Sequence, residues 1–123
     1  MCYSIHSGYY GSKGIVTVSA GIDAQQEETV RAEILRQLDA CKSGDITQEE
    51  LAAAQKALFS SLQTVHDAPG AIEGYYSTGA LSGMNMTPEE YRNAILAVTV
   101  ADVVRAANTV QLHSSFFLKG VGV

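Results

Sequence analysis

The chain has 123 residues, of which 46% are hydrophobic and 17% charged, and its formal net charge is −5. This composition is typical of a folded globular protein, and the length fits one domain over residues 1–123. The acidic balance, with lysine and arginine scattered, argues against a nucleic-acid or anionic membrane surface. No apolar run approaches the roughly 20 residues that a membrane-spanning helix needs.

The two cysteines, Cys2 and Cys41, lie far apart in the sequence and have no CxxC spacing. This pattern favours two free thiols in a reducing compartment over a disulfide or a metal site. The first residues also lack a basic segment followed by an apolar one, so the sequence predicts no signal peptide. Together these features predict a cytoplasmic protein.

Residues 2–20 have the pattern of a β-hairpin. Side chains alternate over residues 3–7, a glycine-rich turn is expected over residues 8–14, and residues 15–19 return as the second strand. The spaced glycines do not match a dinucleotide-binding fingerprint, because a strand and not a helix follows them.

The faces of this hairpin follow from the alternation of side chains along a strand. Tyr3, Ile5 and Tyr9 are expected to share one face. The chain enters the first strand with almost no preceding residues, and we therefore expect it to be a fragment of a longer chain.

Residues 22–65 predict two helices joined by a tight turn. Asp23 is expected to cap the first helix and Gly44 to end it, while Thr47 and Glu50 form a capping box that starts the second. The apolar stripes are Val30, Ile34, Leu38 and Cys41 on the first helix and Leu51, Ala54, Leu58, Leu62 and Val65 on the second. With so short a connection, the two stripes are expected to pack against each other in an antiparallel pair.

Three further helix starts follow. Asp67 is expected to cap a third helix that begins near Pro69 and ends at Gly83. A second capping box over residues 87–90 starts the fourth helix, and residues 99–102 open the fifth.

Residues 112–119 alternate and predict one closing strand. The expected architecture is therefore α+β, with an antiparallel sheet made of the β-hairpin plus the C-terminal strand, packed against about five helices. Three strands are few for so much helical surface, so we interpret the sheet as half of a larger one.

No group of residues in the sequence has the spacing of a catalytic or metal site. A zinc site on a helix needs histidines at i and i+4 with a nearby glutamate, and none of His6, His66 and His113 has a second His or Cys within a turn. His6 and His113 could be neighbours across the sheet, although strand histidines are more often exposed polar residues. No Ser, Cys or Thr has the local sequence of an activated nucleophile.

A series of short segments, in order along essentially the whole chain, resembles the second-half domain of the M16 peptidases, the insulinase and pitrilysin family. The similarity is greatest to the small bacterial members. The segments are Cys2–Ser4, Lys13–Ile15, Ser19–Asp23, Gly44–Leu51, Ala54–Leu58, Asp67 with Pro69, Tyr75 with Tyr76, Thr87–Tyr91, Val98–Val103 and Phe117–Gly120.

The resemblance implies a role without catalysis for this segment. The family's zinc motif, His-x-x-Glu-His, belongs to the other half of the molecule and does not occur here. The second half closes over the substrate and offers an Arg and a Tyr to the bound peptide. Tyr3 occupies the position of that Tyr and is the candidate substrate-binding residue, whereas the Arg would fall before residue 1. The alternative, Tyr3 as a strand residue that packs on the helices, stays open.

Two hypotheses about function result. In the first, the chain is the non-catalytic C-terminal part of an M16-like zinc metallopeptidase, has no peptidase activity or cofactor of its own, and encloses peptide substrate while zinc is held in the other half. Its partners would then be the remainder of the peptidase or a paired M16-like subunit, the peptide, and, through an open sheet edge, a second copy of itself. In the alternative, it is a stand-alone α+β interaction module or an inactive peptidase homologue.

Overall fold

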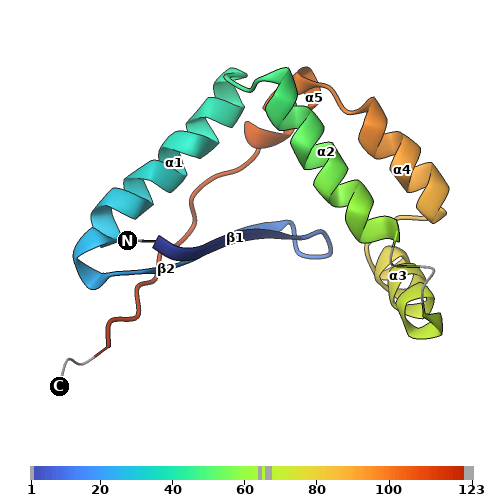
Figure 1. Cartoon of the computed structure of the whole chain (residues 1–123), viewed down its shortest axis with the longest axis horizontal. Coiled ribbons are helices and arrows are strands. Elements are labelled where there is room, and N and C mark those ends of the chain that lie inside the picture. The colour runs from blue at the N-terminus through green and yellow to red at the C-terminus, as the bar shows by residue number, and fades with distance from the viewer. Residues whose placement is uncertain (1, 64, 66–67, 121–123) are drawn as a thin grey trace. The chain divides into compact units, whose positions relative to one another are not determined.

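The structure is a computed structural model that describes residues 2–63, 65 and 68–120 (Figure 1). Over these residues the protein is α+β, with a two-stranded antiparallel sheet and five α-helices, which confirms the predicted class. The elements are β1 (Cys2–Tyr10), β2 (Ile15–Ile22), the 3-10 turn η1 (Ala24–Gln26), α1 (Glu27–Ser43), α2 (Gln48–Gln63), α3 (Pro69–Leu81), α4 (Pro88–Ala97) and α5 (Val100–Ala107).

The chain divides into two compact units. One, the hairpin unit, consists of Met1–Asp45 and Val104–Val123, and the other, the helical unit, is Ile46–Val103. The prediction of a single domain over residues 1–123 stays a prediction. So does the antiparallel packing of the first two helices, because α1 belongs to the hairpin unit and α2 to the helical unit.

The β-hairpin is longer than predicted, with a shorter turn. Ladder pairing runs from Ser4 opposite Gly21 to Tyr10 opposite Ile15, so residues 8–10 belong to β1 and not to the turn. Tyr9 and Tyr10 have high strand propensity, which outweighs the glycine that precedes them. The remaining turn, residues 11–14, ends at Gly14, whose φ of 61° lies in the left-handed region that favours glycine.

The start of α1 differs from the prediction, while its end agrees. The side chain of Asp23 makes no capping hydrogen bond, and η1 separates Asp23 from the first residue of α1. At the other end, Gly44 has a φ of 80° and its N–H donates to the carbonyl of Ala40, which confirms the predicted glycine stop.

Capping chemistry starts α2, α4 and α5 as predicted. In each of three pairs, a threonine hydroxyl accepts from the N–H of an acidic residue three positions later, and that residue's carboxylate accepts from the threonine N–H. The pairs are Thr47 with Glu50, Thr87 with Glu90, and Thr99 with Asp102. Ala68 precedes α3 as its N-cap, and Asp67, the predicted cap, lies outside the described residues.

The helical unit is held together by the contact between α2 and α4. The side-chain amide of Gln55 donates to the carbonyls of Ile95, at 3.0 Å, and Val98, at 3.1 Å, where α4 ends. Ile95 is one of two buried hydrophobic residues in the described part of the chain, the other being Ala107. Gln55 therefore gives a second donor to the Ile95 carbonyl, which also accepts from the Val98 N–H, and a donor to the Val98 carbonyl just after α4.

The apolar stripe of α2 is not a core in this structure. Leu58, which lies at its centre, is 51% exposed, whereas Leu51 and Leu62 are half-buried. The helical unit by itself therefore does not bury Leu58, and its expected contact with the first helix stays a prediction, because α1 belongs to the hairpin unit.

The predicted closing strand is also wrong. Among the described residues, 110–120 form no strand, and the sheet is β1 with β2 alone; Figure 1 draws this segment as a plain coil after α5. Alternation sets which side chains would share a face, but a strand also needs a neighbour for its backbone hydrogen bonds. The segment begins beside Asn108, whose side-chain amide donates to the carbonyls of Val104, at 2.8 Å, and Lys42, at 3.1 Å.

Candidate functional site

Tyr3, the predicted substrate-binding residue, lies in a β-bulge at the open end of the hairpin. Cys2 pairs with Ile22 and Ser4 with Gly21, so β1 advances two residues while β2 advances one, and Tyr3 is the extra residue. A bulge redirects a side chain and is common beside functional sites. The bulge is therefore what sets the direction of the Tyr3 ring.

The bulge places Tyr3 on a different face from the one predicted. A Cβ atom at Gly21 would lie 3.0 Å from Ser4 Oγ and 3.9 Å from Tyr3 Cβ, so Tyr3 and Ser4 share the Gly21 face. Ile5, which pairs with Ala20, faces the opposite side. The expectation that Tyr3 and Ile5 share a face is thus wrong, because alternation is interrupted by the extra residue.

The Tyr3 hydroxyl is held by the carboxylate of Asp23, the residue directly after β2. The hydroxyl donates to Asp23 Oδ1 at 2.5 Å. This hydrogen bond, together with the negative charge of the carboxylate, raises the pKa of Tyr3 above its ordinary value of 10.0. The ring itself is 66% exposed. Tyr3 is thus an exposed aromatic ring with its polar end already bonded, and a peptide could contact the ring without breaking that bond.

One face of the hairpin beyond the bulge is apolar and uncovered. Ile5 pairs with Ala20, Ser7 with Val18, and Tyr9 with Val16, so these side chains line one side of the sheet. The exposed fractions are 59% for Ile5, 71% for Tyr9, 49% for Val16 and 43% for Val18. We call these four residues the apolar face; the opposite face carries His6, Thr17 and Ser19 together with the exposed Tyr10 and Ile15 near the turn.

The histidines do not come together at a site. His6 and His113 are both exposed, and His66 lies outside the described residues. Among the described residues, no three or more His, Cys, Asp or Glu side chains form a group that could hold a metal ion. Both cysteines carry free thiols, with Cys2 exposed and Cys41 half-buried.

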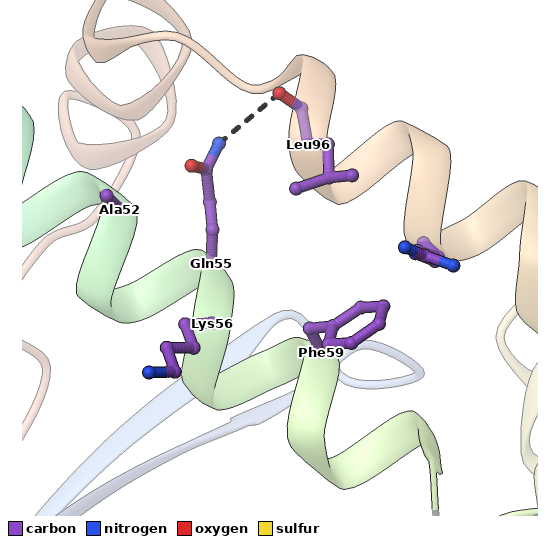
Figure 2. Close-up of a pocket in the computed structure, with 6 residues that line it drawn as sticks. Ala52, Gln55, Lys56, Phe59 and Leu96 are labelled. Carbon is purple, nitrogen blue, oxygen red and sulfur yellow. Dashed lines mark hydrogen bonds between the residues drawn. The ribbon is translucent and has the colours of Figure 1, made fainter.

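The helical unit contains a shallow hollow of about 290 Å³ between α2 and α4 (Figure 2). The hollow is lined by Ala52, Gln55, Lys56, Phe59, Arg92 and Leu96. The guanidinium carbon of Arg92 lies 4.4 Å from the centroid of the Phe59 ring, and the Gln55 amide nitrogen is used in bonds to the end of α4. Gln55 and Arg92 therefore hold α2 against α4, and none of the predicted site residues lines the hollow.

Sequence comparison gives one informative relative. The chain is 28% identical over 121 residues to a protein of Bacillus subtilis strain 168 described as "Probable inactive metalloprotease YmfF". The match covers 98% of this chain but only 28% of the relative, so the chain spans about a quarter of that protein's length. No family model and no solved structure matches the chain. No described helix is both long and apolar enough to cross a membrane.

Asp23 is the site residue that sequence reasoning missed, since it was interpreted only as a helix cap. A signal was present in the hairpin itself. In the observed register Ile5 lies opposite Ala20. Continuing this pairing to the open end of the hairpin brings the residues around 22 opposite Tyr3. Extending the pairing beyond residue 19 would have placed the carboxylate of Asp23 within reach of the Tyr3 hydroxyl.

Proposed function

We propose that this chain is a non-catalytic segment of a metalloprotease-like protein of the M16 type, and that it binds an extended peptide along its β-hairpin. The description of the Bacillus subtilis relative as a probable inactive metalloprotease supports the metalloprotease-like part. It also favours an inactive peptidase homologue as the longer protein. Any zinc chemistry would belong to another part of that protein.

The observation that carries the peptide-binding role is the uncovered hairpin. An extended peptide can add to a sheet edge through its backbone, while alternate side chains contact one face of the sheet. Here β1 presents an unpaired edge beside the exposed side chains of Ile5 and Tyr9. Tyr3, fixed by Asp23 at the open end, would contact the last residue of such a peptide on the opposite face.

The partners follow from the same proposal. The remainder of the metalloprotease-like protein, or a paired subunit of the same type, would enclose the peptide from the other side. We place this assembly in the cytoplasm of a bacterium, as the cysteine pattern and the resemblance suggest.

Peptide titration tests the proposal. The probe is a labelled peptide of eight residues with alternating apolar and polar side chains, and its control has proline at every second position. We expect the first peptide to bind, the proline peptide to bind at least tenfold more weakly, and neither to be cleaved. Equal affinity for both peptides, or no binding at millimolar concentration, would contradict strand addition.

The role of Tyr3 needs a separate comparison. Replacing Tyr3 by Ala should weaken peptide binding by about threefold to tenfold, because a partly exposed aromatic contact contributes about 1 kcal/mol. Tyr76→Ala provides the control, since Tyr76 is an exposed tyrosine, at 49%, in the helical unit. If both variants bind the peptide like the parent, Tyr3 is not a binding residue.

A further inference from the structure

The two strands of the hairpin lack the features that usually protect sheet edges. Natural edge strands are kept from pairing with other chains by charged side chains, proline, shortness or bulges. β1 has nine residues and β2 eight, and neither contains Lys, Arg, Asp, Glu or Pro. The bulge at Tyr3 interrupts only the open end, which leaves Ser4–Tyr10 as a regular and unprotected edge.

Residues 112–119 have the complementary property, a strand-like pattern without a sheet. In an extended conformation, Leu112, Phe116 and Leu118 would share one side. Their exposed fractions are 55%, 86% and 81%. The same chain thus carries an open sheet edge and a segment with the side-chain pattern of an added strand.

We propose that residues 112–119 of one copy pair as a strand with the outer edge of β1 in a second copy, and that the second copy returns the same contact. Such a reciprocal exchange gives a closed two-fold dimer, because each copy uses both its β1 edge and its residues 112–119 within the pair. Leu112, Phe116 and Leu118 would extend the apolar face beside Ile5 and Tyr9. The proposal does not depend on peptide binding, because every group in it belongs to this chain.

The choice of β1 over β2 follows from exposure. All residues of β1 are exposed except Gly8, whereas the last three residues of β2, at Ala20–Ile22, are half-buried where the strand leads toward α1. Because β1 has no charged side chain, the approach of Lys119 brings no like-charge pair. Among the described residues, neither a covering segment nor a charged side chain of β1 opposes a second copy at this edge.

Proline variants test the pairing without changing a helix or strand of the monomer. In an added strand, successive N–H groups point to opposite sides, so proline at one of two adjacent positions must remove a bond to the edge. Ser114→Pro and Ser115→Pro form this pair, with Ser114→Ala and Ser115→Ala as matched controls. Light scattering over a dilution series measures the dimer in all four variants and in the parent.

We expect the parent and both alanine variants to dimerise at micromolar to high micromolar concentration, and at least one proline variant to raise the dissociation constant tenfold or more. Hydrogen exchange of residues 112–119 should slow as the protein concentration rises. A strict monomer, or a dimer that survives in both proline variants, would overturn the proposal. Protection of this segment that does not change with concentration would also overturn it, because the segment would then pair with its own hairpin.

Discussion

At the scale of single residues, the contact between Tyr3 and Asp23 joins the two ends of the hairpin. Tyr3 lies near the start of β1, and Asp23, twenty residues later, directly follows the end of β2. The charged acceptor strengthens the bond relative to a neutral one. The interaction also fixes the ring that we propose for peptide contact, so the titration of Tyr3 reports on the site.

The pKa of Tyr3 should fall toward 10.0 when Asp23 is replaced by Asn, because the carboxylate that raises it is removed. A folded-state pKa above the unfolded value stabilises the fold below about pH 10, and this contribution is lost as pH rises through the raised pKa. NMR titration of ring-labelled tyrosines measures the change. Tyr75, whose pKa is raised mainly by burial, is the internal control and should titrate alike in both proteins.

Two glycines of α3 should respond in opposite directions to the same substitution. A Cβ atom at Gly79 would lie 2.9 Å from the backbone carbonyl oxygen of Met84, whereas one at Gly74 meets nothing within 4 Å. We expect Gly79→Ala to lower the free energy of unfolding by about 1–3 kcal/mol, because the turn after α3 must shift. Gly74→Ala should raise it by up to about 1 kcal/mol through helix propensity. Urea unfolding followed by circular dichroism decides, and equal effects would contradict the close approach at Gly79.

At the scale of elements, the starts of α2, α4 and α5 were predictable from the sequence, whereas the start of α1 and the packing of the helices were not. A capping box such as Thr87 with Glu90 is made by residues three positions apart, so sequence alone contains both partners. The hydrogen bonds from Gln55 join residues about forty positions apart, and no local pattern encodes them. The apolar stripe around Leu58 has the same limit, since a stripe shows that a face is apolar but not what covers it.

Gln55→Ala should destabilise the helical unit. The substitution removes the donor to the carbonyls of Ile95 and Val98, and a lost bond at a partly buried site costs about 1–3 kcal/mol. The control is Gln48→Ala at the exposed first turn of the same helix, which should change the free energy of unfolding by less than about 0.5 kcal/mol. Thermal unfolding of the two variants measures the stability that each has lost. If they lose the same stability, the amide of Gln55 does not hold the end of α4.

At the scale of the whole molecule, the class of fold was predictable, whereas the completed sheet was not. The hairpin and helices follow from patterns within short windows, but residues 112–119 needed a partner strand that the described chain does not provide. Tyr3 was placed by resemblance alone, and its bulge and its bond to Asp23 depend on the register of two strands. The features that the sequence did not predict are therefore those that depend on pairing between distant segments.

Large apolar side chains lie exposed on the hairpin and on residues 112–119. Ile95 and Ala107 are the buried hydrophobic residues of the described chain, while Tyr9, Phe116 and Leu118 are at least 71% exposed. Exposed apolar surface of this kind binds the dye ANS, even in a protein whose helices are formed. We expect strong ANS fluorescence at low micromolar protein and less fluorescence per chain as the concentration rises through the dimer range. The proline variant that prevents dimerisation should keep the strong signal at every concentration. Weak fluorescence from the dilute parent, with its helical circular dichroism intact, would mean that the apolar face and residues 112–119 already cover each other within one chain.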